Sequence, residues 1–257
     1  GWLGVGWTLD MGAIERSTRR GVPAYDTTDT FTLLFHSIAG DLVRLPDGTY
    51  RPADDGIAVR VVNNGANGWE LREPSGLRYF FGGTPETELR RADGAVFRWA
   101  LRHVLDRHGN YMDLTYTKDQ GQLYLSTIQY TGHEPTATLP TNLIRCTVID
   151  RGDDVETSYR SGFAITTAKI LQQIEIIANT QPVRTYRLGY GTSVGTGRLL
   201  LLRVALFGAD GRTSLPETLF SYQDNSQANY TFRSNQRQLG TVAWNVRTAS
   251  LDIGTQE

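Results

Sequence analysis

Histidines and nearby carboxylates come closest to a catalytic or metal-binding set in this sequence. The chain has 4 histidines, and one short segment holds His103, Asp106 and His108. On a β-strand, residues 106 and 108 would share one face while residue 103 would point to the other. The run from Asp106 to Asn110 also has the composition of a turn. Since the sequence nominates no third zinc ligand, we interpret the run as a turn and keep a hydrolase or metalloenzyme around Asp106 and His108 as an open alternative.

Two further nucleophile candidates have simpler structural explanations. The chain has 1 cysteine, Cys146, so it has no internal disulfide framework and no cysteine-based zinc site. Its neighbours are mostly apolar, which is typical of a buried, unreactive thiol. Ser161 lies in Tyr159-Arg160-Ser161-Gly162-Phe163 and not in the G-x-S-x-G pattern of a hydrolase elbow. We therefore interpret Ser161 as a turn residue.

Glycine-rich and acidic segments also lack the patterns of known binding loops. The glycines within residues 1–6 and 191–197 are not followed by a helical pattern that would offer its N-terminus to a phosphate. Asp150, Asp153 and Asp154 have oxygens suited to calcium, but their spacing fits no EF-hand loop. We predict no catalytic residue, no metal site and no cofactor, and hence no enzyme.

Charge and apolar patterning argue against two classes of partner. The 257-residue chain carries 27 acidic residues against 26 lysines and arginines, so it lacks the basic excess of a broad nucleic-acid-binding face. Its longest apolar run, residues 199–202, is far shorter than the roughly 20 residues that span a bilayer. We predict neither nucleic-acid binding nor a transmembrane segment.

The 5 tryptophans and 12 tyrosines offer one other route to function, because aromatic rings can stack on sugars. In β proteins such residues more often fill the faces of sheets. We favour the core interpretation and keep a glycan- or receptor-binding β module with exposed aromatics as the main alternative.

Short apolar or alternating runs between turn signals dominate the chain and predict an all-β protein. Residues 31–35 and 69–72 are typical, and separators such as Pro46-Asp47-Gly48 supply turn conformations. The best helix candidate, residues 168–178, is followed by a turn-like run at residues 179–182 and an alternating run at residues 183–188. We interpret it as a hairpin with a four-residue turn. The predicted fold class is antiparallel hairpins and meanders that form part of an extended β-sheet shell or sandwich.

Composition shifts divide the chain into sections. Residues 132–141 contain two prolines and no periodicity, so we predict a loop there. It separates an N-terminal β section, residues 1–131, from a C-terminal β-hairpin section, residues 142–223. Residues 224–257 are predicted to be a polar linker or tail. Because the chain opens at Gly1 without a methionine, we expect it to be a section of a longer protein.

A weak internal repeat links two hairpin-like stretches. Residues 101–116 and 202–222 each contain a strand-like run, a turn with Asp and Gly, and a second run that ends in tyrosine. This similarity predicts a hairpin unit that is used more than once.

A series of short motifs, in a fixed order, resembles the SpvB/TcaC-type N-terminal region of bacterial toxin-complex (Tc) B subunits, SpvB-like virulence proteins and Rhs/YD-repeat proteins. The resemblance begins with the run from Gly4 to Leu9 and extends to about Gln223. The residues that carry it are Gly4, Gly6, Trp7, Arg16, Gly21, Pro23, Tyr25, Phe31, Trp99, Asp106, Gly109, Asn110, Tyr116, Gly162, Phe163, Tyr190, Gly208, Asp210, Gly211, Pro216 and Tyr222.

The resemblance implies a non-catalytic role in a secreted or cell-surface bacterial protein. In the Tc members this region resembles part of a hollow β-rich shell that encloses a separate toxic enzyme. The expected partners are therefore the remaining β-shell domains of a parent protein and a toxic effector domain. Nothing in the sequence resembles the ADP-ribosyltransferase domain or the self-cleavage site that other members of these families carry.

Overall fold

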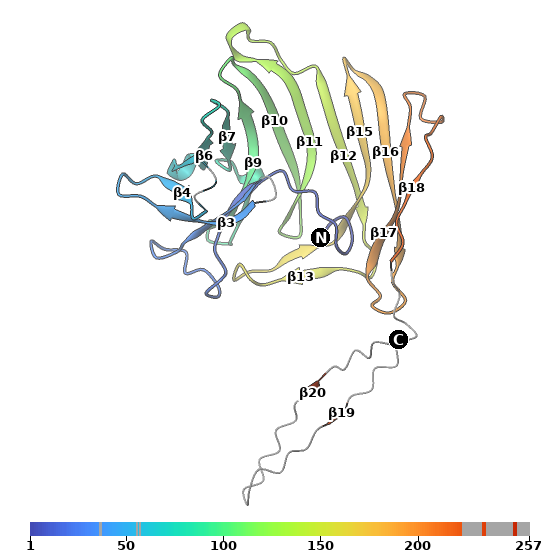
Figure 1. Cartoon of the computed structure of the whole chain (residues 1–257), viewed down its shortest axis with the longest axis horizontal. Coiled ribbons are helices and arrows are strands. Elements are labelled where there is room, and N and C mark those ends of the chain that lie inside the picture. Colours follow the sequence, from blue (N-terminus) through green and yellow to red (C-terminus); the bar gives the residue numbers. More distant parts are fainter. Residues whose placement is uncertain (36–37, 55, 57, 223–232, 235–248, 251–257) are drawn as a thin grey trace, which may run out of the picture.

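The structure is a computed structural model that describes residues 1–35, 38–54, 56, 58–222, 233–234 and 249–250. It is dominated by antiparallel strands, which confirms the predicted fold class (Figure 1). The main sheet contains β1 (Ala13–Arg16), β2 (Phe31–Phe35), β3 (Ile38–Arg44), β4 (Tyr50–Pro52), β5 (Arg60–Asn63), β6 (Trp69–Arg72), β7 (Arg78–Phe81), β8 (Glu88–Arg90), β9 (Val96–Leu105), β10 (Asn110–Asp119), β11 (Gln122–His133), β12 (Asn142–Asp150), β15 (Lys169–Ala178), β16 (Gln181–Thr192), β17 (Leu199–Phe207) and β18 (Thr218–Leu219).

Smaller elements complete the described part of the chain. Two-residue and three-residue strands form separate pairs, β13 (Glu156–Ser158) with β14 (Ile165–Thr167) and β19 (Arg233–Ser234) with β20 (Ala249–Ser250). The helical segments are short 3₁₀ turns, η1 (Gly65–Asn67), η2 (Pro85–Thr87) and η3 (Glu134–Thr136). No helix among these described residues is long and apolar enough to cross a membrane.

The first part of the main sheet closes into an eight-stranded barrel. Its strands run in the order β1-β2-β3-β4-β5-β6-β7-β9, and β9 pairs back to β1 through Ile14 opposite Trp99. Closure removes the free edges that a sheet of this size would otherwise present. Alternation of buried and outward side chains, as at Phe31, Leu33 and Phe35 of β2, directs one face of each strand into the barrel.

Strand β9 is part of both the barrel and the open sheet that follows it. The Gly82 amide donates to the Ala100 carbonyl, whereas the next residue, Leu101, donates its amide to the Gly12 carbonyl. Neighbouring residues of a strand bond toward opposite edges, so β7 and β8 lie along one edge of β9 while β1 and β10 lie along the other. The first half of β9 therefore closes the barrel, and its second half begins an open sheet.

The open sheet continues from β10 through β11, β12, β15, β16 and β17 to β18, and it curves away from the barrel (Figure 1). The predicted hairpin at residues 168–188 is present as β15 and β16. Its predicted turn length was wrong, because Asn179 and Thr180 turn the chain alone with φ of 46° and 67°. Pro182 lies within β16 beside a β-bulge, where its missing N–H is tolerated.

Of the predicted loop at residues 132–141, Gly132 and His133 belong to β11, and residues 134–141 connect it to β12. The same sheet runs across this connection because Ile128 pairs with Ile144. The division into sections at residues 1–131 and 142–223 stays a prediction. The predicted tail at residues 224–257 lies outside the described residues, apart from β19 and β20. The sequence did not predict β1, β4, β8, β13 or β14, which are short strands that local patterning hardly distinguishes from loops.

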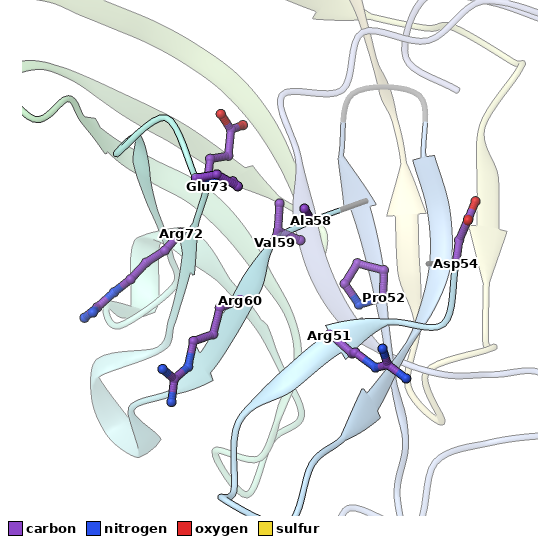
Figure 2. A pocket seen from close by; sticks show the side chains of 9 residues that line it. Arg51, Pro52, Asp54, Ala58, Val59, Arg60, Arg72 and Glu73 are labelled. Atoms are coloured by element: carbon purple, nitrogen blue, oxygen red, sulfur yellow. The ribbon is translucent and has the colours of Figure 1, made fainter. Parts of the chain in front are cut away.

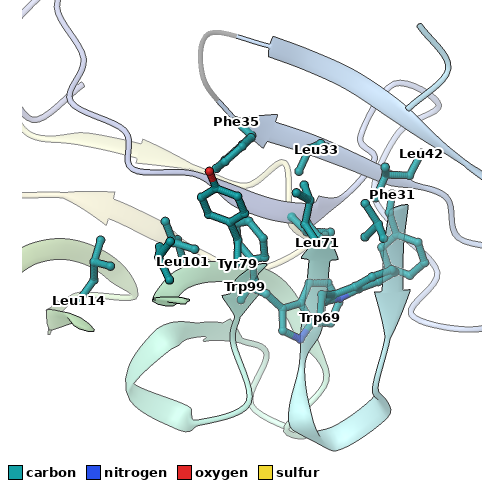
Figure 3. Close-up of a cluster of buried hydrophobic side chains, with 14 of the residues drawn as sticks. Phe31, Leu33, Phe35, Leu42, Trp69, Leu71, Tyr79, Trp99, Leu101 and Leu114 are labelled. Carbon is teal, nitrogen blue, oxygen red and sulfur yellow. The ribbon is translucent and has the colours of Figure 1, made fainter. Parts of the chain in front are cut away.

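Aromatic side chains fill the barrel (Figure 3). Phe31 makes edge-to-face contacts with Trp69 at 4.7 Å and Trp99 at 5.9 Å between ring centroids. Trp69 is 1% exposed and Trp99 is 7% exposed, which agrees with the core interpretation for these two rings. Trp2 is partly buried, Trp7 is 38% exposed, and Trp244 lies outside the described residues.

A buried carboxylate ties β6 to β7 on the outside of the barrel. Glu70 accepts two hydrogen bonds from Arg72, at 2.8 and 2.9 Å, and one from Arg78 at 2.6 Å. Burial alone would raise the pKa of Glu70, but these hydrogen bonds and positive charges outweigh it and lower the pKa below its usual value.

We expect Glu70→Gln to cost roughly 1–2 kcal/mol in free energy of unfolding near neutral pH, because both guanidinium groups are partly exposed to water. The folded pKa lies below the unfolded value of about 4.3, so this contribution is complete above that pH and is lost as the pH falls through the folded pKa. Urea unfolding between neutral pH and pH 3 should therefore show that acid lowers the free energy of unfolding less in Glu70→Gln than in the parent chain. Glu86→Gln, on the exposed turn η2, is the control. If the free energy of unfolding falls equally with pH in Glu70→Gln and the parent chain, ionised Glu70 does not stabilise the fold.

Candidate functional site

The sequence-predicted cluster at His103, Asp106 and His108 is not brought together by the fold. Asp106 accepts hydrogen bonds from the His108 and Asn110 amides, each at 2.8 Å, inside the β9–β10 turn. The hydrogen bond from the Asn110 side chain is the largest cause of its lowered pKa. His103 points to another partner, with Nδ1 2.7 Å from Asp113 Oδ1. The turn interpretation therefore describes the role of Asp106 in this structure.

The other residues considered from the sequence as nucleophiles or metal ligands have structural roles in the fold. Burial raises the pKa of the Cys146 thiol to about 11. Ser161 is buried, and its hydroxyl donates to the Phe163 carbonyl at 2.8 Å. Asp150 pairs with Lys169, and Asp154 pairs with Arg151. In the described part of the chain, no three His, Cys, Asp or Glu side chains lie close enough to hold a metal ion.

The N-terminal motif forms a strap, residues 1–12, that crosses the strands of the open sheet (Figure 1). The Leu171 amide of β15 donates to the Trp2 carbonyl at 2.9 Å. The Val5 amide donates to the Leu199 carbonyl of β17 at 2.9 Å, and at the other end the Gly12 carbonyl accepts from Leu101 of β9 at 3.0 Å. The strap therefore links β9, which closes the barrel, to the far side of the open sheet.

Glycine is required where the strap approaches β17. Gly4 has a φ of +88°, and a Cβ atom there would lie 2.8 Å from the Leu199 carbonyl oxygen. Gly6 also has a positive φ, of +80°, but the space around it is open. The first glycine of the motif thus permits close contact, and the second permits the turn.

Trp7 of the strap joins the two ends of the predicted motif series. Trp7 Nε1 donates to the Tyr222 hydroxyl at 2.8 Å, and the Trp7 ring contacts Phe220 at 4.8 Å between centroids. Trp7 and Tyr222 are 215 positions apart in the sequence. Two motifs that the sequence placed at opposite ends of the resemblance therefore form one contact.

β-Bulges lie beneath the strap. One extra residue interrupts the pairing of β9 at Arg102, of β15 at Gln172 and of β17 at Leu202. A bulge leaves a backbone group without its ladder partner. In each case the leucine before the extra residue is buried, and these are Leu101, Leu171 and Leu201.

A tyrosine hydroxyl satisfies the carbonyl of each of these leucines. Tyr116 donates to Leu101 at 2.6 Å, Tyr190 to Leu171 at 2.7 Å, and Tyr222 to Leu201 at 2.7 Å. Burial raises the pKa of Tyr116 and Tyr190, which keeps both hydroxyls protonated and able to donate. The predicted repeat ending in Tyr116 and Tyr222 thus has a physical basis, and Tyr190 shares it. Sequence reasoning missed the bulges, since no residue type marks them.

A second cluster gathers motif residues at the base of the barrel. Arg16 of β1 donates to Asp29 at 2.6 Å and to the Val96 carbonyl at 2.8 Å. Its guanidinium lies 5.0 Å from the centre of the Tyr25 ring, 5.5 Å from Phe31 and 5.9 Å from Trp99. Arg16, Tyr25, Phe31 and Trp99 are therefore one contact group.

The remaining motif residues shape loops and turns. Asp210 accepts from the Arg212 and Thr213 amides at 3.0 and 2.9 Å, as Asp106 does in its own turn. Left-handed φ values mark the glycines of these turns, and Pro216 lies between β17 and β18. The glycines with positive φ are Gly21, Gly109, Gly162 and Gly211, whereas Gly208 is not among them. The loop around Pro23 contacts the segment of Gly162 and Phe163, since a Cβ atom on Gly162 would lie 2.7 Å from Val22.

A buried ion pair anchors the β12–β13 connection to β17, and sequence reasoning missed it. Arg151 donates to Asp154 at 2.6 Å, and Asp154 lies 2.6 Å from Arg198 and accepts from the Leu199 amide at 2.9 Å. Burial alone would raise the pKa of Asp154, but the Leu199 amide and the two arginines lower it overall. Sequence reasoning considered Asp153 and Asp154 only as calcium ligands, because no local pattern indicates that Arg198, 44 residues after Asp154, completes an ion pair.

A groove of 440 Å³ opens on the barrel wall between β4 and β5 (Figure 2). Pro52, Ala58 and Val59 line its apolar part. Arg51 points away from Arg60 and Arg72 in this view, so the three guanidinium groups do not converge. The groove therefore lacks the arrangement of donors that an anion site requires.

Comparison with known proteins shows which family and which solved structures this chain resembles. Residues 1–55, which include the strap, match the family model described as Salmonella virulence plasmid 65kDa B protein, SpvB. The N-terminal domain of effector protein SpvB from Salmonella typhimurium strain LT2 superposes with a TM-score of 0.68 at 18% identity, over 81% of this chain and 90% of that one. The predicted resemblance is confirmed. No curated protein matches the sequence.

The SpvB-like fold also occurs within much longer toxin chains. The TcdB2–TccC3 structure matches with a TM-score of 0.75 at 18% identity, over 91% of this chain. The Photorhabdus luminescens Tc holotoxin pore matches with a TM-score of 0.67 at 18% identity, again over 91% of this chain. This chain spans 15% of the length of each of those chains. At this level of identity, the likeness shows a shared fold.

We expect Tyr190→Phe to lower the free energy of unfolding by about 1–3 kcal/mol, because it leaves the buried Leu171 carbonyl at a bulge without its donor. Tyr130→Phe is the matched control, since Tyr130 is half-buried and its hydroxyl makes no hydrogen bond among the described residues. Chemical denaturation of both variants measures the difference. Equal stability of the two variants would show that the tyrosine hydroxyl does not support the bulge.

Proposed function

We propose that this chain is a non-catalytic structural β module of a secreted or cell-surface SpvB/Tc/Rhs-type bacterial protein. In this role it contributes to a shell that encloses or presents a toxic effector. Its partners are the remaining β-shell domains of the parent protein and the effector domain. The shared fold with TcdB2–TccC3 and with the SpvB N-terminal domain supports the proposal.

The open edge of the sheet at β18 is the strongest support for the proposal. In the part of the chain that the structure describes, the sheet is closed at one side by the β1–β9 pairing and ends at the other side on β18, a strand of 2 residues. Leu219 on β18 is 72% exposed, and nearby Leu215 is 60% exposed. Apolar side chains beside an open sheet edge are typical of a surface that meets a further strand or layer.

The same geometry favours a scaffold over an enzyme. The side chains nominated for chemistry are held in turns and ion pairs, as at Asp106 and Asp154. The most specific contacts of the motif residues are between the chain's own elements, as in the pair of Trp7 and Tyr222. Their role is thus to fix the shape of a module whose outer surfaces meet other parts of a larger protein.

Light scattering of the 257-residue chain over a concentration series tests the proposal. We expect the chain to self-associate through its open edge, because no strand among the described residues pairs with the outer side of β18 or covers Leu219. Leu219→Lys should reduce the association, whereas Leu139→Lys, at an equally exposed leucine far from that edge, should not. A strictly monomeric chain, or equal effects of the two variants, would count against a shell module.

Glycan or receptor binding is the second candidate, and the exposed pair of Trp7 and Tyr222 favours it. A titration of the chain with a sugar panel, followed by tryptophan fluorescence, separates the two functions. Saturable binding that is lost in Trp7→Ala would favour this candidate, whereas the shell proposal predicts no saturable change.

A further inference from the structure

We propose that the β13–β14 hairpin is an arm that is latched to the barrel by Tyr25 and opens from it as a unit. The arm comprises residues 156–167, whose strands pair with each other in a sheet separate from the main one. Its base is tied to the β10–β11 turn, where the Thr166 amide donates to the Gln120 carbonyl at 3.0 Å. Its tip, residues 159–163, reaches the barrel.

The tip meets the loop between β1 and β2 through a small set of contacts. The Tyr25 hydroxyl donates to the Ser161 carbonyl at 2.5 Å, and Arg160 donates to the Thr18 hydroxyl. A Cβ atom on Gly162 would lie 2.7 Å from Val22, so the two segments are in direct contact there. These contacts close the arm over the barrel.

Tyr25 is held in a conformation that a bulky residue rarely adopts. Its φ is 66°, in the left-handed region. The Asp29 carboxylate holds this conformation by accepting from the Ala24 amide at 2.8 Å and from the Tyr25 amide at 2.7 Å. Arg16 in turn fixes Asp29 through a 2.6 Å ion pair. Strained residues that the surroundings enforce in this way often mark a functional position.

The ring of Tyr25 is fixed from the barrel side as well. The Arg16 guanidinium lies 5.0 Å from its centre, and the Arg91 guanidinium, in the β8–β9 turn, lies 4.2 Å from it. Among the described residues, the arm's hydrogen bond to Tyr25 uses a backbone group, the Ser161 carbonyl. The barrel half of the latch is therefore preorganised, and the arm can leave without any rearrangement of the groups that position Tyr25.

Opening of the arm would uncover an aromatic contact at the base of the barrel. Phe163 of the arm lies edge-to-face against Phe97 at 6.3 Å between ring centroids. Phe97 is buried in the closed state. The latch thus controls access to this apolar surface, and this inference is independent of the shell proposal.

Hydrogen exchange of the whole chain, read by mass spectrometry, tests the latch. Tyr25→Phe keeps the ring between the two guanidinium groups but removes the hydrogen bond to Ser161. We expect exchange of residues 156–167 to rise about fivefold, while exchange of β6 and β15 stays unchanged. Trypsin cleavage after Arg160, at the arm tip, should accelerate in parallel.

Tyr159→Phe is the matched control, because Tyr159 lies on the same arm and its side chain is 67% exposed. It should leave exchange and cleavage as in the parent chain. The proposal is overturned if Tyr25→Phe leaves the arm as protected as before, if its effect equals that of Tyr159→Phe, or if exchange rises equally in β6 and β15.

Discussion

Hydrogen bonding between the strap and the bulged strands is the interaction on which the rest of this structure depends. Bulges in β9, β15 and β17 interrupt the ladders of the sheet at buried positions, where unpaired backbone groups are costly. The strap satisfies the Leu101 and Leu171 amides, and tyrosine hydroxyls satisfy the carbonyls of the same leucines. We therefore expect the strap and the bulges to stabilise each other, because each satisfies backbone groups of the other.

This arrangement explains why a barrel and an open sheet remain one body. Strand β9 belongs to both, and the strap adds a second connection from Gly12 beside β9 to Val5 beside β17. At the base of the barrel, Arg16 and Tyr25 connect β1 to the arm that extends from the open sheet. The open edge of the sheet is therefore held at a fixed angle to the barrel, which is what the proposed shell role requires.

The sequence predicted elements whose signal is local and missed those that depend on distant partners. Alternation and turn residues were enough for the all-β class and for the hairpin of β15 and β16. Barrel closure could not be predicted, because it depends on β1, a strand of 4 residues paired with β9 more than 80 positions later. The motif residues were named only through the family resemblance, and both the set and the individual roles stay predictions. Their contacts, such as Trp7 with Tyr222, depend on the folded chain.

We expect the strap to make the barrel and the open sheet one cooperative unit. Native-state hydrogen exchange at increasing denaturant tests it at two amides, Leu71 in the barrel and Leu171 in the open sheet, whose amide binds the strap. If the strap unites the two parts, both amides exchange through one opening with the same free energy. If Leu171 exchanges through a separate opening of lower free energy while Leu71 stays protected, the strap does not unite the two parts.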